Sequence, residues 1–268
     1  MALNNITLGQ YYPADSVVHR LDPRVKIVLL VALIVAIFLA QNVLALAPVV
    51  VFLYVAARLS KVPFSMMIKG LKPLRFILIL TFVLNVFFLQ GETPLVNLGF
   101  AVITREALVM AVHYSLRLVF LVLASSLLTL TTAPIVLTDG LERLLSPLRV
   151  IRFPAHEMAM MMSIALRFIP TLLEEADKIM KAQTARGADF ESGNLIQRAK
   201  AMVPLLVPLF VSAFRRAGDL AMAMEARCYH GGEGRTRLRV LKCEKRDYIA
   251  CALTALLILA VVLCGKIY

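Results

Sequence analysis

Apolar runs long enough to cross a lipid bilayer alternate with charged segments along this chain. No charged residue occurs from Ile27 to Ala57. A crossing of about 30 Å takes about 20 helical residues, so this run is too long for one span. Gln41-Asn42 interrupts it, and Asp22-Pro23 supplies an N-cap followed by a proline at the first helical position. The pattern predicts a hairpin of two short spans, Pro23–Ala40 and Val43–Leu59.

Three further apolar runs predict three further spans: Leu74–Gln90, Arg105–Leu130 and Ile249–Gly265. The loop Gly91–Thr104 contains no Lys or Arg, so we expect it outside the cell. His113 and Arg117 lie one turn apart in the fourth span. Ionisable residues inside a membrane are functional candidates, and a structural or headgroup-facing role is the alternative.

The segment between the fourth and fifth spans has helical spacing throughout. It predicts three helices, Pro134–Leu148, Pro154–Ala185 and Pro204–Arg227. In the last of these, alanines recur at the small-xxx-small spacing that lets two helix backbones approach closely. These alanines, Ala213, Ala217 and Ala221, predict a close helix crossing.

Composition and charge then fix the class of protein and its orientation. Hydrophobic residues make up 60% of the 268 residues, well above the share of about 45–50% in soluble domains. The chain has 29 Lys and Arg against 17 Asp and Glu, and 18 of the 29 lie between Thr131 and Tyr248. Basic residues stay on the cytoplasmic side, so this excess predicts a cytoplasmic segment rather than a nucleic-acid interface.

The same rule argues against a sixth span. The uncharged run Ala201–Phe214 has only 14 residues and contains Pro204 and Pro208. A crossing there would place one of two basic clusters outside, so we expect the run at the inner membrane surface. The sequence therefore predicts an all-α, multi-pass plasma-membrane protein with about five transmembrane helices and a cytoplasmic N-terminus. Its predicted parts are a four-span bundle (1–131), a cytoplasmic module of long helices (132–248) and a last transmembrane helix (249–268).

The sequence predicts no metal site, no ATP site and no catalytic site in this chain. The four cysteines match no zinc-ligand spacing, so we expect no metal site. Gly231-Gly232-Glu233-Gly234-Arg235-Thr236 lacks the spacing of a phosphate-binding loop, so we expect no ATP site in this chain. An intramembrane enzyme would need a nucleophile and base on facing spans, and a stand-alone carrier usually has inverted repeats. Neither pattern occurs, so we expect a non-catalytic protein without a cofactor.

Two tripeptides end two of the predicted cytoplasmic helices alike, 41 residues apart. They are Ala185-Arg186-Gly187 and Ala226-Arg227-Cys228. An Arg in the last turn interacts favourably with the helix dipole, and Gly187 suits a left-handed cap. Paired Arg tips also suit docking into acidic grooves on two similar partners, because the planar guanidinium binds carboxylates through two parallel hydrogen bonds.

These tips and the opening of the chain resemble a known family along essentially the whole sequence. The resemblance rests on Gly9-Gln10-Tyr11-Tyr12-Pro13, on the segment His19 to Lys26 with Asp22, Pro23, Arg24 and Lys26, and on both Ala-Arg tips. The chain is similar to the transmembrane T component of energy-coupling factor (ECF) transporters, which is related to the Q component of cobalt and nickel importers. The second tip departs from the family pattern, because Cys228 stands where Gly is common.

The resemblance implies a coupling subunit of an ATP-driven importer for vitamins or other micronutrients. Two ABC ATPases, which bind the ATP, would dock on the tips at Arg186 and Arg227. A substrate-binding S component would lie against this chain in the membrane and release its substrate inward. A component of a cobalt or nickel importer is the alternative that the resemblance leaves open.

Overall fold

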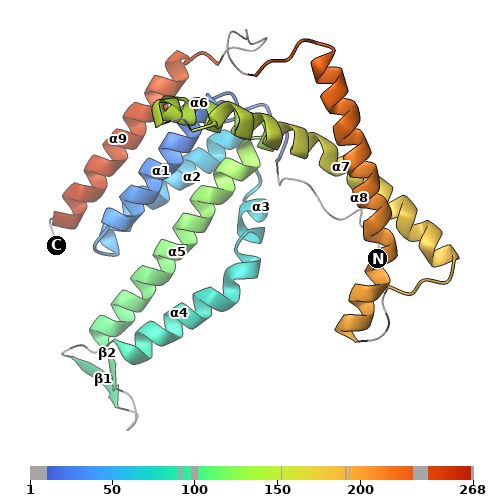
Figure 1. Cartoon of the computed structure of the whole chain (residues 1–268). Coiled ribbons are helices and arrows are strands. Elements are labelled where there is room, and N and C mark those ends of the chain that lie inside the picture. The colour runs from blue at the N-terminus through green and yellow to red at the C-terminus, as the bar shows by residue number, and fades with distance from the viewer. Residues whose placement is uncertain are drawn as a thin grey trace. The chain divides into compact units, whose positions relative to one another are not determined.

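The structure, a computed structural model, describes residues 11–89, 91, 93–97, 102–151, 153–190, 192, 194–231 and 241–266. Its helices are α1 Pro23–Leu39, α2 Ala47–Ser60, α3 Phe64–Lys69, α4 Arg75–Phe88, α5 Arg105–Thr131, α6 Pro134–Leu145, α7 Ala155–Ala185, α8 Leu195–Glu225 and α9 Lys245–Lys266 (Figure 1). Short 3₁₀ turns cover η2 Leu44–Leu46, η3 Lys72–Leu74 and η4 Ser146–Ile151. The predicted all-α membrane fold is confirmed.

The chain divides into two units, each described here by itself. The membrane unit comprises Gly9–Leu144 and Val240–Tyr268, and the coupling unit comprises Met1–Leu8 and Leu145–Arg239. The membrane unit therefore contains α1 to α6 and α9, and the coupling unit contains α7 and α8.

Helices α1, α2, α5 and α9 form the core of the membrane unit. Its buried residues are Leu33, Ile37, Ala40, Ala45, Leu46, Val49, Leu53, Phe120, Ala124, Leu257 and Val261. Small residues recur where these helices meet, and Ala36, Ala40, Ala45 and Ala111 are fully buried. Alanine at such positions lets helix backbones approach closely, which is how membrane helices gain packing contacts in the absence of water.

Helix α4 packs along α5, yet most of its large side chains face outward. Phe76 and Phe88 are 70% and 79% exposed. An apolar surface of this extent is unfavourable in water and favourable in hydrocarbon, so lipid is the solvent of this face.

Several element boundaries differ from the prediction. Helix α8 begins at Leu195, nine residues before Pro204, because Asn194 and Gln197 form a reciprocal capping box there. Pro204 and Pro208 consequently lie inside the helix. Helix α9 begins at Lys245, four residues before the predicted start. The loop predicted to be external contains a short antiparallel hairpin, β1 Pro94–Asn97 and β2 Val102–Thr104, which the sequence analysis did not predict.

Within the described ranges, four helical segments have the length and composition of membrane spans. They are Phe64–Phe88, Arg105–Thr131, Ile196–Glu225 and Lys245–Lys266, and a shorter apolar segment covers Leu44–Ser60. Ile196–Glu225 includes the run that the charge pattern places beneath the membrane. Helix α1, the first predicted span, has 17 residues and begins with the predicted Asp22 N-cap and Pro23.

Helix α6 approaches the start of α1 so closely that Gly140 has no room for a side chain. A Cβ on Gly140 would lie 2.9 Å from Cβ of Pro23 and 3.1 Å from the Pro23 carbonyl carbon. We predict that Gly140→Ala lowers the free energy of unfolding by about 1–3 kcal/mol, because backbone must shift to admit the methyl group. The melting temperature of the purified protein measures this effect.

Gly218→Ala is the matched control, because a Cβ there meets no atom within 4 Å. Alanine in the helix interior should leave stability unchanged or raise it by up to about 1 kcal/mol. Equal melting temperatures for Gly140→Ala and the unmodified protein would contradict the close approach.

Candidate functional site

The first predicted docking tip is a helix end whose backbone geometry is fully defined. At the end of α7, the N–H of Ala188 donates to the carbonyl of Gln183 (3.0 Å) and the N–H of Gly187 donates to that of Thr184 (2.9 Å). These two bonds make a Schellman motif, and Gly187 has the left-handed φ of +89° that the motif requires. Arg186 is therefore held at the last position before the chain reverses.

The second tip repeats this geometry without a glycine. At the end of α8, the N–H of Tyr229 donates to the carbonyl of Met224 (3.1 Å) and the N–H of Cys228 donates to that of Glu225 (2.8 Å). Cys228 takes the left-handed position with φ +54°. Each residue of this motif follows its counterpart in the first tip by 41 positions, so Arg227 occupies the place of Arg186.

Both arginines are available to a partner. Arg186 and Arg227 are exposed, and neither guanidinium is paired with another side chain among the described residues. The preceding alanines, Ala185 and Ala226, are exposed as well. Each guanidinium can donate two parallel hydrogen bonds to one carboxylate.

An ion pair joins the two helices behind the tips. The side-chain nitrogen of Arg216 on α8 lies 2.7 Å from a carboxylate oxygen of Glu175 on α7, with both side chains half-buried. Figure 1 shows α7 and α8 crossing. Each Arg tip lies 11 residues beyond this pair on its own helix, about 16 Å at 1.5 Å per residue. The two arms beyond the crossing are therefore of equal length.

This ion pair is not among the predicted contacts, although the sequence contains a pattern that indicates it. Glu175 and Arg216 are separated by 41 positions, the same offset that relates the two tips. Of the predicted crossing stripe, Ala213 is half-buried, whereas Ala217 and Ala221 are exposed. A close crossing of another helix at this stripe stays a prediction.

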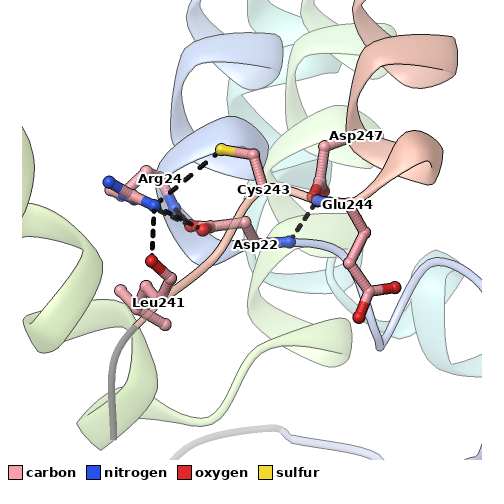
Figure 2. Close-up of polar contacts among 6 residues, drawn as sticks. All are labelled: Asp22, Arg24, Leu241, Cys243, Glu244 and Asp247. Atoms are coloured by element: carbon pink, nitrogen blue, oxygen red, sulfur yellow. Dashed lines mark hydrogen bonds and ion pairs between the residues drawn. The ribbon is translucent and has the colours of Figure 1, made fainter.

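The opening motif lies in the membrane unit, where its side chains join the starts of two helices (Figure 2). The Asp22 carboxylate accepts hydrogen bonds from the backbone N–H of Arg24 (2.9 Å) and from the Arg24 guanidinium (3.1 and 2.8 Å). Burial alone would raise the pKa of the Asp22 carboxyl, but these hydrogen bonds outweigh it and hold the pKa below its ordinary value. Asp22 is thus a charged N-cap of α1.

A second carboxylate, which the sequence analysis did not single out, completes this junction. Asp247 in the first turn of α9 accepts the backbone N–H of Asp22 (2.9 Å) and that of Glu244 (2.8 Å). One buried carboxylate therefore binds the N-terminal ends of α1 and α9. The Arg24 guanidinium also donates to the carbonyl of Leu241 (3.2 Å), just before α9. We call Asp22, Arg24 and Asp247 the polar junction.

Lys26 attaches a third helix to this face. Lys26 is buried, with 7% of its surface exposed. Its ammonium group donates to the carbonyls of His19 (3.1 Å) and Thr131 (3.0 Å) and to the hydroxyl of Thr132 (3.1 Å). Thr131 is the last residue of α5, so the cation meets the negative end of that helix dipole. All four residues of the predicted opening motif, Asp22, Pro23, Arg24 and Lys26, therefore lie where α1, α5, α6 and α9 meet.

His113 and Arg117 have structural contacts at the other end of α1. The Arg117 guanidinium donates to the carbonyl of Ala40 (2.8 Å), the residue that caps α1, and lies 3.1 Å from Nε2 of His113. It also lies over the Phe38 ring at 5.5 Å. The pair ties α5 to the C-terminal end of α1. Within the described part of the chain, no group of three His, Cys, Asp or Glu side chains could hold a metal ion.

Comparison with known proteins agrees with this architecture. The chain is a multi-pass membrane protein, and the family model described as CbiQ, cobalt transport protein, matches residues 14–238. The chain therefore belongs to the CbiQ family, as the sequence resemblance predicts.

Several similar relatives bear the name energy-coupling factor transporter transmembrane protein EcfT. The protein of Clostridium kluyveri is 55% identical over 267 residues, which are 99% of this chain and 98% of the relative. Those of Acidaminococcus fermentans and Bacillus subtilis are 55% and 49% identical over 258 and 261 residues, 96% and 97% of this chain and 94% and 98% of each relative. The chain is accordingly a non-catalytic transmembrane subunit of an energy-coupling factor transporter.

The two tips predict opposite effects of exchanging their left-handed residues. A side chain in the left-handed region costs about 1–2 kcal/mol, and glycine avoids this cost. Cys228→Gly should therefore raise the free energy of unfolding by about 1 kcal/mol, and Gly187→Ala should lower it by a similar amount. Melting temperatures of the purified variants measure both effects.

Cys228→Ser is the control, since it removes the thiol and keeps a side chain at the left-handed position. Its melting temperature should equal that of the unmodified protein. A stabilisation by Cys228→Ser equal to that by Cys228→Gly would contradict the backbone explanation.

Proposed function

We propose that this chain couples two ABC ATPases to a substrate-binding S component in a vitamin or micronutrient importer. The observation that carries the proposal is the repeated tip: two exposed arginines, Arg186 and Arg227, held by the same capping motif at the ends of two crossing helices. Two like tips suit two like partners. Arginine suits an acidic groove on each ATPase, because its guanidinium binds a carboxylate in a fixed geometry.

The crossing gives the tips a mechanical role. The Glu175–Arg216 pair lies at equal distance along each helix from its tip, so motion of the two ATPases relative to each other would turn α7 against α8 about this pair. ATP-driven closure of the ATPases supplies that motion. The helices then transmit it to the S component, which releases its substrate inward.

The contacts of the membrane unit support a cytoplasmic location for the coupling unit. The end of α5 at Thr131 is bonded to Lys26, and the start of α9 is bonded to Asp22, so both lie at the N-terminal end of α1. The chain thus leaves and re-enters the membrane unit at one face. A single crossing by α8 would require these two ends to lie at opposite faces, so the contacts favour α8 beneath the membrane.

The distribution of charge favours the cytoplasm as the side to which that face belongs. Eighteen basic residues lie between Thr131 and Tyr248, and the positive-inside rule retains them there. The N-terminus then lies inside, and the hairpin β1–β2 between α4 and α5 lies outside.

A cobalt or nickel importer is the second candidate, and the description of the matching family favours it. The relatives that cover almost the whole chain favour the energy-coupling factor type instead. One experiment separates these two candidate functions. It identifies the small membrane protein that copurifies with the chain and measures whether the complex takes up a vitamin or Co²⁺ or Ni²⁺.

The docking proposal predicts the effect of truncating the tips. Arg186→Ala and Arg227→Ala should each weaken ATPase association by about 2 kcal/mol or more, because the acidic groove residues lose their partner. Arg→Lys should restore association only in part, since lysine lacks the guanidinium fork. The measurement is ATPase copurification and substrate uptake, with membrane insertion checked for each variant.

Arg167→Ala on α7 and Arg215→Ala on α8 are the matched controls, since both side chains are exposed and lie away from the tips. They should leave copurification unchanged. If the double variant Arg186→Ala/Arg227→Ala still copurifies both ATPases at the normal level, the docking assignment is wrong.

The topology predicts which positions a membrane-impermeant thiol reagent reaches. In a cysteine-free background, Thr93→Cys beside the hairpin should be labelled in intact cells. Ser192→Cys between α7 and α8 should be labelled only after permeabilisation, because the coupling unit is cytoplasmic. Labelling of Ser192→Cys in intact cells would overturn the topology.

A further inference from the structure

A basic pocket opens on the membrane unit at the end of α2. Its cavity volume is about 390 Å³, and its lining includes Asp15, Arg20, Arg58, Leu59, Lys61 and Arg246. These residues come from the segment before α1, the end of α2 and the first turn of α9. Neither the docking tips nor the polar junction includes any of them.

Positive charge is in excess in this pocket. Four basic side chains line it together with one carboxylate, Asp15, which is paired with Arg20 at 2.6 Å. The guanidinium of Arg58 lies over the ring of Tyr54 at 5.9 Å, and a guanidinium over a ring keeps its N–H donors for an anion. Arg246 lies 3.7 Å from the Glu244 carboxylate, in an exposed ion pair. Arg58 and the exposed Lys61 have no ion-pair partner among the described residues, so the pocket keeps an excess of positive charge for an anionic group.

An apolar stripe leads away from the pocket along α2. Val51, Val55 and Leu59 recur every four residues, so they lie on one face of the helix. They are 62%, 47% and 51% exposed, and Leu59 itself lines the pocket. On a membrane helix such a face meets acyl chains. Basic residues at the helix end next to it are placed at the level of the lipid headgroups.

We propose that this pocket binds the phosphate of an anionic phospholipid, with an acyl chain lying along the Val51–Val55–Leu59 stripe. The basic residues recognise the phosphate, and the stripe selects a lipid over a free phosphate ion. This site is independent of ATPase docking. It would hold the loop before α1, the end of α2 and the start of α9 together at the membrane face that carries the polar junction.

The experiment is a lipid titration of the purified full-length chain followed by native mass spectrometry. Phosphatidylglycerol is compared with phosphatidylcholine of the same acyl chains, and Arg58→Gln/Arg246→Gln is the test variant. We expect phosphatidylglycerol to bind the unmodified chain at least tenfold more tightly than phosphatidylcholine. Each basic residue near a charged lipid surface contributes about a fivefold factor, so the variant should bind phosphatidylglycerol roughly 25-fold more weakly.

Lys69→Gln/Lys72→Gln is the matched control, because it removes the same charge from exposed positions outside the pocket. It should change phosphatidylglycerol affinity less than twofold. Equal weakening in both double variants would overturn the proposal in favour of general surface charge. If the test variant is poorly folded, Arg58→Gln alone replaces it. This variant should bind phosphatidylglycerol about fivefold more weakly, and equal weakening by Lys69→Gln or Lys72→Gln would overturn the proposal.

Inorganic phosphate separates the two sources of the anion. Millimolar phosphate should leave bound phosphatidylglycerol in place, because it has no acyl chain to lie on the stripe. Full displacement of the lipid by phosphate would overturn the proposal and make the pocket a site for a free anion.

Discussion

The carboxylate of Asp247 joins the N-terminal ends of α1 and α9, and the arrangement of the membrane unit depends on this contact. It accepts the backbone N–H of Asp22 before α1 and that of Glu244 before α9, at 2.9 and 2.8 Å. Helix N-termini carry unsatisfied donors and partial positive charge, so a shared carboxylate satisfies both ends and draws them together. Lys26 donates to the carbonyl of Thr131 at the end of α5, so the contacts around Asp22 join three helices: α1, α5 and α9.

Both chain segments that connect the membrane unit to α7 and α8 have contacts at this face. The chain leaves the membrane unit through α6, where Gly140 lies against Pro23, and returns past Leu241, whose carbonyl accepts from Arg24. The opening motif therefore contacts both chain segments that lead to and from α7 and α8. In the proposed function, motion produced at the tips would reach the membrane unit through these two segments.

Features set by neighbouring residues could be predicted from the sequence, whereas features set by distant pairs could not. The Asp22-Pro23 start of α1 and the Arg186-Gly187 end of α7 follow from local capping preferences. The contact of Asp22 with Asp247 joins residues 225 positions apart, and no local pattern indicates it. The predicted start of α8 at Pro204 is wrong by nine residues. The capping box of Asn194 and Gln197 starts the helix at Leu195, and this Asn-x-x-Gln pattern is a local feature of the sequence.

In the proposed mechanism, α7 and α8 turn about the Glu175–Arg216 pair when the ATPases close. Spin labels at Ala182 and Ala223, both exposed and near the tips, report this motion by pulsed electron resonance in the assembled transporter. We predict one distance distribution without nucleotide and a clearly shifted one with a non-hydrolysable ATP analogue. The shift should disappear when Arg186 and Arg227 are both alanine. Identical distributions with and without nucleotide, in a complex that still transports, would contradict the account.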